Sequence, residues 1–251
     1  MKKLALALVA ALPLAFASCG DDDKDLTLDQ SALNLNYQAE ATLKASESKC
    51  TWSSSNPFVA SVDDKGNVKA EHVGVAVITA TKDGATAKCN VTVNATNNNF
   101  EFPIMSWGST VEAIKGAVSS SNFNLASSSA DALVYSTKNA ADGYPFYAYL
   151  FENNALYASQ FTVTEAMDIQ YDLEGWLEQY YKEAYFDDDM MAQIYMNANT
   201  AADATVSVAY GPDEDGHWYA IFVDQSDNTR SSSDIKAAVA KAKAVVKEAK
   251  N

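Results

Sequence analysis

The first part of the chain alternates between hydrophobic and polar positions with a period of two. In the clearest stretch every second residue is apolar: Ala87, Cys89, Val91 and Val93. Because successive side chains of a β-strand point to opposite faces, this alternation predicts strands with one buried face. Turn-forming sequences such as Asn56-Pro57 separate the strands. Residues 26–94 are therefore predicted to form an all-β sandwich of short strands.

Short motifs within this segment carry a family resemblance. In chain order they are residues 51–57 (TWSSSNP), 59–62 (VASV), 66–68 (GNV), Gly74 and 76–80 (AVITA). Residues 26–94 resemble a bacterial immunoglobulin-like (Ig-like) domain of group 2. The resemblance implies an Ig-like sandwich of the kind that surface proteins and adhesins use as a spacer or a carbohydrate-associated module. It does not imply catalysis.

Two of the three cysteines lie in this domain. Cys89 shares its face with inward valines, and Cys50 has the same parity as Trp52, so both thiols are expected to face the core. An even pair in an exported chain predicts a disulfide between them. Two free buried thiols are the alternative, because buried cysteine also packs as a small hydrophobe.

The pattern changes after the polar run 94–99, which we take as a domain boundary. Apolar positions at helical spacing predict a helix through Val111, Ile114 and Val118, with Ser109 as its N-cap and Glu112 completing a capping box. A second helical stripe runs from Leu173 to Ala184. Each helix is followed by three runs with strand character, at 132–136, 145–151 and 156–163, and at 193–196, 205–210 and 217–223.

Residues 100–224 are therefore predicted to form an α+β domain, an antiparallel sheet with helices, from a tandem α-β-β-β repeat. This order of elements is loosely similar to that of the beta-lactamase inhibitory protein and of small outer-membrane assembly lipoproteins, without a shared motif. Residues 231–251 predict an amphipathic helix whose apolar stripe includes Ile235, Val239 and Val246. Packing on the sheet is favoured over contact with a membrane or a partner through its lysines, because the alanine-rich stripe is too weak for membrane insertion.

The N-terminus has the features of an export signal. Lys2 and Lys3 precede an apolar run, residues 4–14, that is too short to span a bilayer, and small residues lead to Cys19. Residues 1–18 resemble a bacterial lipoprotein signal peptide, which implies a diacylglycerol on Cys19 after cleavage. Simple secretion after the Ala-Phe-Ala sequence is the alternative. The acidic segment 19–25 is expected to be a solvated leash. It resembles the signal that exports some lipoproteins to the outer surface of the outer membrane.

Charge and motifs exclude several functions. The formal net charge of −15 argues against nucleic acid as a partner. The sequence lacks a nucleophile elbow, a phosphate loop, a zinc-ligand pair and a dinucleotide fingerprint, so we expect no enzyme and no cofactor. Two acidic runs, 187–189 and 213–216, contain fragments of calcium loops but not the full ligand spacing. We interpret the second as a hairpin turn, and His72 as a loop residue rather than a metal ligand.

Aromatic residues of the second domain offer a candidate ligand surface, because exposed rings stack on sugars. The candidates are Tyr144, Tyr147, Tyr149, Tyr157 and Trp218. Most of these rings are expected to belong to the core instead.

The sequence as a whole favours a non-catalytic surface lipoprotein. In this interpretation the Ig-like domain spaces a second domain, which binds a glycan or a protein, away from the membrane. An envelope assembly or inhibitor protein is the alternative, and a glycan-active enzyme is less favoured because no carboxylate pair stands out.

Overall fold

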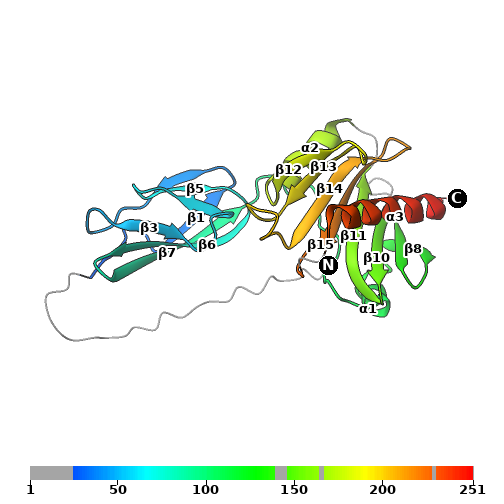
Figure 1. The fold of residues 1–251 in the computed structure, drawn as a ribbon, viewed down its shortest axis with the longest axis horizontal. Coiled ribbons are helices and arrows are strands. Elements are labelled where there is room, and N and C mark those ends of the chain that lie inside the picture. Colours follow the sequence, from blue (N-terminus) through cyan, green and yellow to red (C-terminus); the bar gives the residue numbers. More distant parts are fainter. Residues whose placement is uncertain (1–24, 139–145, 164–166, 228–229, 251) are drawn as a thin grey trace.

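A computed structural model describes residues 25–138, 146–163, 167–227 and 230–250. They form two domains joined end to end (Figure 1). Cys19 and Tyr144 lie outside the described residues. Within the described part of the chain, no helix has the length and apolarity needed to cross a membrane.

The first domain is a β-sandwich of two sheets with strand orders β1-β7-β6-β3 and β2-β5-β4. Its strands are β1 (Ala32–Asn36), β2 (Glu40–Thr42), β3 (Thr51–Ser54), β4 (Ala60–Val62), β5 (Asn67–Ala70), β6 (Gly74–Lys82) and β7 (Ala85–Asn94). Strand β1 pairs with β7 in parallel, and the other pairs are antiparallel. The core between the sheets includes Val68 of β5 and Ile78 and Val91 of the larger sheet. The predicted sandwich is confirmed.

Trp52 of β3 packs against this core beside a tight turn. A Cβ atom at Gly66 would lie 2.9 Å from Cζ2 of Trp52 and 2.5 Å from the carbonyl oxygen of Leu43. Gly66 also has a φ of +82°, in the left-handed region that favours glycine. Both the close approach and the backbone conformation therefore require glycine here.

The predicted disulfide is wrong, because Cys50 and Cys89 are both free thiols. Strands β3 and β7 belong to the same sheet and β6 lies between them. Two strand spacings separate their backbones by roughly 9–10 Å, whereas the Cα atoms of a disulfide lie within about 7 Å of each other. Cys89 packs in the core as a small apolar side chain, and the half-buried Cys50 donates its thiol to the carbonyl of Glu47.

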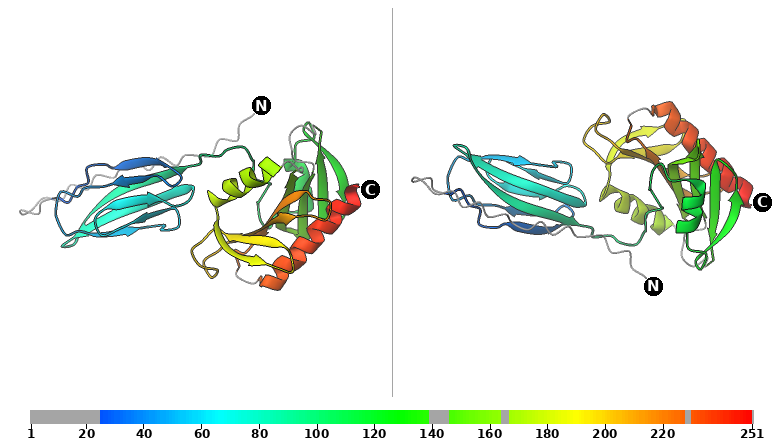
Figure 2. Two further views of the ribbon diagram at one scale, coloured as in Figure 1. Left: turned by 90° about the horizontal axis from the view of Figure 1, so that it is seen from above. Right: turned by 90° about the horizontal axis from the view of Figure 1, so that it is seen from below.

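The second domain is an antiparallel sheet, eight-stranded in the described residues, with helices on both faces (Figure 2). The strand order is β12-β13-β14-β15-β11-β10-β9-β8. The elements are α1 (Val111–Ala117), β8 (Phe123–Ser128), β9 (Ala132–Thr137), β10 (Phe146–Glu152), β11 (Ala155–Val163), α2 (Met167–Glu178), β12 (Lys182–Asp187), β13 (Ala192–Met196), β14 (Val206–Pro212), β15 (Trp218–Asp224) and α3 (Ser232–Lys250).

The predicted repeat is present, but each unit has four strands after its helix rather than three. The two strands that the sequence did not predict, β8 and β12, are the outer edges of the sheet. Equivalent strands start 59 to 63 residues apart; β9 and β13, for example, begin at Ala132 and Ala192. The units meet where β11 pairs with β15 in antiparallel fashion. Equivalent strands that pair this way are related by a local two-fold axis perpendicular to the sheet.

Two helix ends differ from the predicted ones. Helix α2 ends at Glu178, so Ala184 lies in edge strand β12 rather than in a helix. Helix α1 is capped by Thr110 instead of Ser109, because the Thr110 side chain accepts a hydrogen bond from the N–H of Ala113.

The two faces of the sheet are packed differently. Helices α1 and α2 cover an aromatic face, where Trp176 of α2 is buried among rings such as Phe161 and Phe222. Helix α3 covers the opposite face, whose side chains are mostly small. Figure 2 shows α2 on the side toward the Ig-like domain and α3 on the far side.

The joint between the domains is a buried polar contact centred on Gln179, just after α2. Its side chain is 1% exposed. Its Oε1 accepts hydrogen bonds from the N–H groups of Thr96 and Asn97, and its Nε2 donates to the carbonyl of Asn97. The Gln179 carbonyl accepts from the N–H of Val73, the residue before β6. The carboxamide therefore holds the link against the second domain, and the bond from Val73 joins the Ig-like domain itself to Gln179.

Candidate functional site

Helix α3 positions the candidate site, and its own sequence sets where it begins. Ser231 precedes the helix, and its N–H and hydroxyl donate to Oδ2 of Asp234 at 2.6 and 2.7 Å. A carboxylate at this position accepts a hydrogen bond from a backbone N–H that has no partner within the helix. It also interacts favourably with the helix dipole. These hydrogen bonds hold the pKa of Asp234 below its usual value. Lys247 and Lys250 lie at the opposite end, where the dipole favours cations.

The buried face of α3 rests on a surface of alanines. On the helix the buried residues are Ile235, Ala238, Val239, Ala242 and Val246. On the sheet they include Ala132, Ala148, Ala158, Ala192 and Ala209. Because these side chains are small, the helix can approach the sheet closely. The prediction that this helix packs on the sheet is confirmed.

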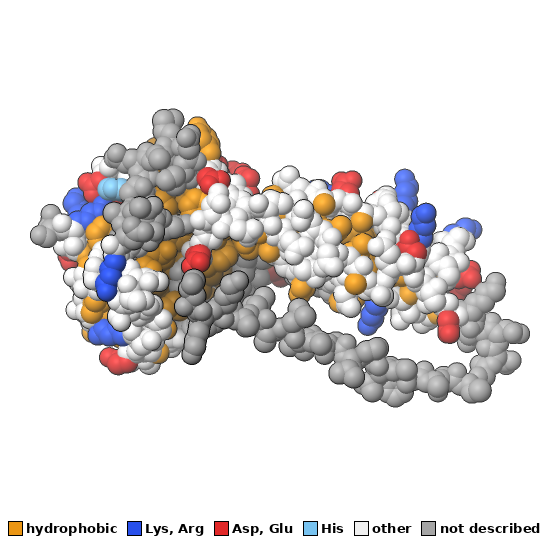
Figure 3. Space-filling model, turned by 180° about the vertical axis from the view of Figure 1, so that it is seen from behind, with side chains coloured by type: hydrophobic (Ala, Val, Ile, Leu, Met, Phe, Trp, Pro, Cys, Tyr) orange, Lys and Arg blue, Asp and Glu red, His pale blue; other side chains and the backbone are white. Residues whose placement is uncertain are grey.

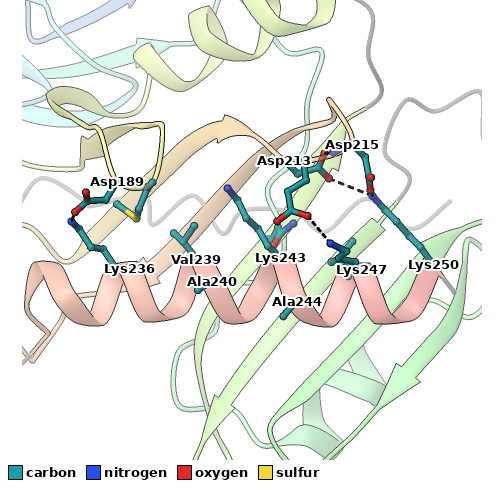
Figure 4. A pocket seen from close by; sticks show the side chains of 14 residues that line it. Asp189, Asp213, Asp215, Lys236, Val239, Ala240, Lys243, Ala244, Lys247 and Lys250 are labelled. Carbon is teal, nitrogen blue, oxygen red and sulfur yellow. Dashed lines mark hydrogen bonds and ion pairs between the residues drawn. The ribbon is translucent and has the colours of Figure 1, made fainter.

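A cleft of ≈ 590 Å³ lies along one side of α3 (Figure 4). The helix forms one wall, and the turns after β12 and β14 contribute the opposite wall. Lysines and carboxylates alternate around it: Lys236, Lys243, Lys247 and Lys250 with Asp189, Asp213, Glu214 and Asp215. Apolar contacts come from Met190, Val239, Ala240, Ala244 and Val246.

Three of these lysines are engaged by carboxylates. Lys236 Nζ lies 2.7 Å from Asp189 and 3.1 Å from Asp187, and Lys247 pairs with Glu214. The pKa of Lys236 is raised by its hydrogen bonds to Asp189 and Asp187. These pairs tie α3 to the two hairpins.

Lys250 closes the cleft at the C-terminal end of α3. Its Nζ lies 2.9 Å from Asp215 Oδ2, 3.3 Å from Asp213 Oδ2 and 3.3 Å from His217 Nδ1. The side-chain ligand atoms of Asp213, Asp215 and His217 lie within 4.8 Å of one another, a spacing that could hold a metal ion. The Lys250 ammonium occupies this cluster and balances one of its two carboxylate charges.

The acidic sequence of that cluster also explains the turn. Asp213 Oδ1 accepts hydrogen bonds from the N–H groups of Asp215 and His217, each at 2.9 Å. Gly216 follows with a φ of +83°. The interpretation of residues 213–216 as a hairpin turn is confirmed. Asp187 plays a similar part, since its Oδ1 accepts from the N–H groups of Asp189 and Met190.

Lys243 differs from the other three lysines. Among the described residues, no carboxylate lies within ion-pair distance of it. Its Nζ stands 4.4 Å above the ring of Tyr219 and donates a long hydrogen bond, 3.3 Å, to the carbonyl of Pro212. Burial lowers the pKa of Lys243. It is a half-buried cation with a weak set of partners.

Gln160 of β11 adds a buried polar group to the lining of the cleft. The residue is 2% exposed, and its Oε1 has no hydrogen-bond partner within the described chain. A buried acceptor left unpaired costs about 1–3 kcal/mol. The cleft therefore presents an unpaired acceptor and a weakly paired cation.

The predicted aromatic residues do not come together as one surface. Tyr147 and Tyr149 are 9% and 3% exposed, on the face covered by α1 and α2. Burial raises the pKa of Tyr149 to about 12. Trp218 is half-buried on the same face, and its ring lies 4.9 Å from that of Tyr210. These rings belong to the core, as favoured from the sequence.

Tyr157 lies on the other face of the sheet, among residues that pack near α3. The guanidinium of Arg230 stands 4.5 Å above its ring and also pairs with Glu152. The ring is thus half-buried and covered by a cation.

Sequence reasoning missed Lys243 and Gln160. The four lysines recur along α3 at spacings that place them toward one side, which gave a partial signal. Nothing in the sequence around Gln160 marks it, because a glutamine in an apolar strand predicts only a polar position.

Comparison with known proteins classifies the first domain. Its two face-to-face sheets define an Ig-like β-sandwich, and residues 27–93 match the bacterial Ig-like domain of group 2. The first domain is therefore a bacterial Ig-like domain of that group, as the resemblance implied. An uncharacterized protein of Clostridium acetobutylicum is 56% identical over 46 residues, which are 17% of this chain and 5% of that protein.

Several solved structures are similar to parts of the chain. One is the C-terminal 282-residue fragment of intimin, in complex with the intimin-binding domain of the translocated intimin receptor. It is 20% identical, with coverage of 74% of this chain and 58% of the fragment and a TM-score of 0.26. Another is a SusE-like surface located polysaccharide binding protein from the Bacteroides thetaiotaomicron heparin utilisation locus. It is 14% identical, with coverage of 57% and 31% and a TM-score of 0.21.

Proposed function

We propose that this protein is a non-catalytic binding protein, held on a membrane by lipid at Cys19, that presents the α3 cleft at its outer end. The Ig-like domain acts as the spacer. The observation that carries the proposal is the end-to-end arrangement of the two domains, joined at Gln179, with α3 on the side remote from the Ig-like domain (Figure 2). A cleft so placed is directed away from the anchored end.

The path of the chain supports a spacer. Strand β1 runs parallel to β7, whose last residue leads into the joint. The chain therefore enters the Ig-like domain at the end opposite the joint (Figure 1). A lipid at Cys19 and the acidic segment 19–25 would precede that entry, so the length of the domain would separate the membrane from the cleft.

The two surfaces also differ in character. On the face drawn in Figure 3, hydrophobic side chains gather more densely on the second domain than on the Ig-like domain, where they are scattered among charged side chains and backbone. Exposed hydrophobic side chains that gather on one domain are typical of a surface that contacts a ligand or a partner. The polar lining and volume of the cleft fit a ligand site, since such sites range over about 300–1,000 Å³.

A second candidate is a protein-binding lipoprotein of the assembly or inhibitor type. Edge strand β12 favours it, because Tyr185 and Phe186 are 42% and 51% exposed and Met191 nearby is 60% exposed. Exposed apolar side chains beside an unpaired strand edge suit contact with another protein. Co-purification of one protein partner, lost with Phe186→Ser and retained with Lys243→Met, would favour this candidate.

The anchor and the display can be tested on intact cells. Labelled palmitate should enter the wild-type protein and not the Cys19→Ala variant. Protease added to intact cells should remove the second domain if the protein lies on the outer face of an outer membrane. Absence of label in the wild type would overturn the anchor, and full protection from protease in intact but not lysed cells would place the protein inside.

The non-catalytic binding role needs a separate assay. The purified protein is screened on an array of bacterial and host glycans and by pull-down from envelope extracts. A saturable ligand without product formation is the expected result. Turnover of a polysaccharide would overturn the non-catalytic part of the proposal.

A further inference from the structure

We propose that the cleft beside α3 binds an acidic saccharide, with a sugar carboxylate paired to Lys243 and a sugar hydroxyl donating to Gln160. The inference rests on the proposed function, since it names the ligand class of the site that the spacer would present. It follows from the two polar groups that the fold leaves poorly paired in the lining of one cleft.

Lys243 can accept an anionic partner, since Asp213 and Glu214 act on its charge without lying at ion-pair distance. An ammonium group removed from water is stable when it is paired with negative charge. The other three lysines of the cleft each have a carboxylate within 3.1 Å, whereas the best oxygen partner of Lys243 is the neutral carbonyl of Pro212 at 3.3 Å. The Tyr219 ring lies 4.4 Å below the ammonium and offers only a modest cation–π attraction. Burial holds the pKa of Lys243 below that of ordinary lysine.

Gln160 requires a donor. Its Oε1 is an acceptor with two lone pairs, and both lack a partner within the described chain. A ligand hydroxyl or N–H group that donates to it would remove the cost of the buried unpaired oxygen. A ligand that satisfies the cleft therefore carries both an anionic group and a hydrogen-bond donor.

The carboxylates at the rim of the cleft favour a saccharide over a peptide as its ligand. Its carboxylates, Asp189, Asp213, Glu214 and Asp215, are acceptors for the many hydroxyls that a sugar carries. Lys236, Lys247 and Lys250 pair with these carboxylates and offset most of their negative charge, which reduces the repulsion of an acidic ligand. A peptide backbone needs alternating donors and acceptors, which a strand edge supplies. The walls here are instead the side chains of a helix and of two hairpin turns.

The apolar wall completes the site. Met190 and Val239 line the same cleft as Lys243 and Gln160, and they can cover the less polar face of a sugar ring. Lys243 and Gln160 lie beside these aliphatic side chains and would orient the ring, with its carboxylate toward Lys243.

Calorimetry on the full chain in detergent tests the inference. The probes are tetrasaccharides of galacturonic, glucuronic and mannuronic acid, their methyl esters, and a tetraglutamate peptide. At least one acidic tetrasaccharide should bind saturably and its ester weakly. Lys243→Met should lower that affinity by about tenfold or more, because a charge-assisted hydrogen bond is lost. Lys243→Arg should recover part of it.

Two controls separate recognition from folding. Lys115→Met removes an exposed lysine from α1, on the opposite face of the sheet, and should leave binding unchanged. Gln160→Leu keeps the side-chain volume and removes an acceptor that is unpaired in the free protein. Because the unpaired oxygen is removed, the unfolding midpoint should stay the same or rise, while the affinity falls several-fold.

The outcomes that contradict the inference are distinct. Equal binding of acids and methyl esters would overturn the role of the carboxylate. Tetraglutamate binding as tightly as the best saccharide would overturn the saccharide. No binding by any uronic tetrasaccharide would overturn the ligand class, yet the anchoring, protease and array results would still decide the proposed display function. Binding that Lys243→Met leaves intact would move the site away from this cleft.

Discussion

Gln179 and Thr96 share a three-atom contact in which Oε1 of the glutamine accepts from both the N–H and the hydroxyl of the threonine, at 2.6 and 2.9 Å. Thr96 lies in the link that leaves the Ig-like domain, and Gln179 follows α2 of the second domain. Asp172 of α2 supports the contact, since its carboxylate accepts from the side-chain amides of Asn97 and Asn99. The link is therefore a structured part of the second domain.

Replacement of Gln179 should loosen this joint. Gln179→Leu removes the acceptor of the N–H groups of Thr96 and Asn97, and each lost hydrogen bond costs about 0.5–1.5 kcal/mol. Faster hydrogen exchange at those two amides and a broader distribution of shapes in small-angle scattering are expected. Gln30→Leu, at an exposed position of the Ig-like domain, is the matched control. Unchanged exchange would show that other contacts hold the domains.

The two thiols of the Ig-like domain should react differently. Cys50 is half-buried, whereas Cys89 is 0% exposed and burial raises the pKa of its thiol. Iodoacetamide at pH 8 should therefore label Cys50 in the folded protein and label both residues only after denaturation. Peptide mass spectrometry gives the positions. A Cys50–Cys89 linked peptide in the non-reduced protein would contradict the structure.

The stability of the Ig-like domain should depend on His72 in mildly acidic solution. Its ring stacks on Phe58 with centroids 3.9 Å apart, and Nδ1 lies 2.7 Å from the Phe58 carbonyl oxygen, to which it can donate. Burial lowers the pKa of His72 below 6.5. As the pH falls through 6.5, the unfolded chain takes up a proton before the folded one does. This contribution to stability is therefore complete above 6.5 and declines below it.

The matching measurement is the free energy of unfolding between pH 7.5 and pH 5 for the wild type and for His72→Phe. The phenylalanine can keep the stacking but cannot titrate, so the wild type should lose more stability over this range. Parallel curves would refute the assignment.

The alanine surface under α3 should reject larger side chains. Ala242 is 0% exposed against the sheet, so Ala242→Leu is expected to destabilise the second domain by about 1–3 kcal/mol through overpacking. Ala237→Leu changes an exposed position of the same helix and should have little effect. Urea midpoints compare the two. Equal midpoints would mean that α3 can move away from the sheet without cost.

The sequence predicted elements whose pattern comes from burial. Central strands such as β11 and β15 were found within two residues of their observed ends, because both of their faces are covered and most of their residues are apolar. Edge strands gave no such signal. Strand β8 is largely exposed and carries asparagine and serines, so only its pairing with β9 makes it a strand.

The cysteine prediction failed for a related reason. Parity gives the face on which a side chain lies, and it placed Cys89 in the core correctly. It does not give the order of strands in a sheet, which places β6 between the strands around the two cysteines. The cleft could not be predicted for the same reason. Gln160 and Lys243 line one cleft only because α3 packs on the sheet that contains β11.

The antiparallel pairing of β11 with β15 has a consequence for how such a domain can arise. Two identical half-length chains could form the same sheet as a symmetric dimer, with this strand pair as their shared boundary and one helix of the α1 or α2 kind on each half. A single helix crossing the opposite face cannot obey that symmetry. Once one chain carried both halves, α3 could contact them unequally, and an asymmetric recess for a single ligand became available to selection.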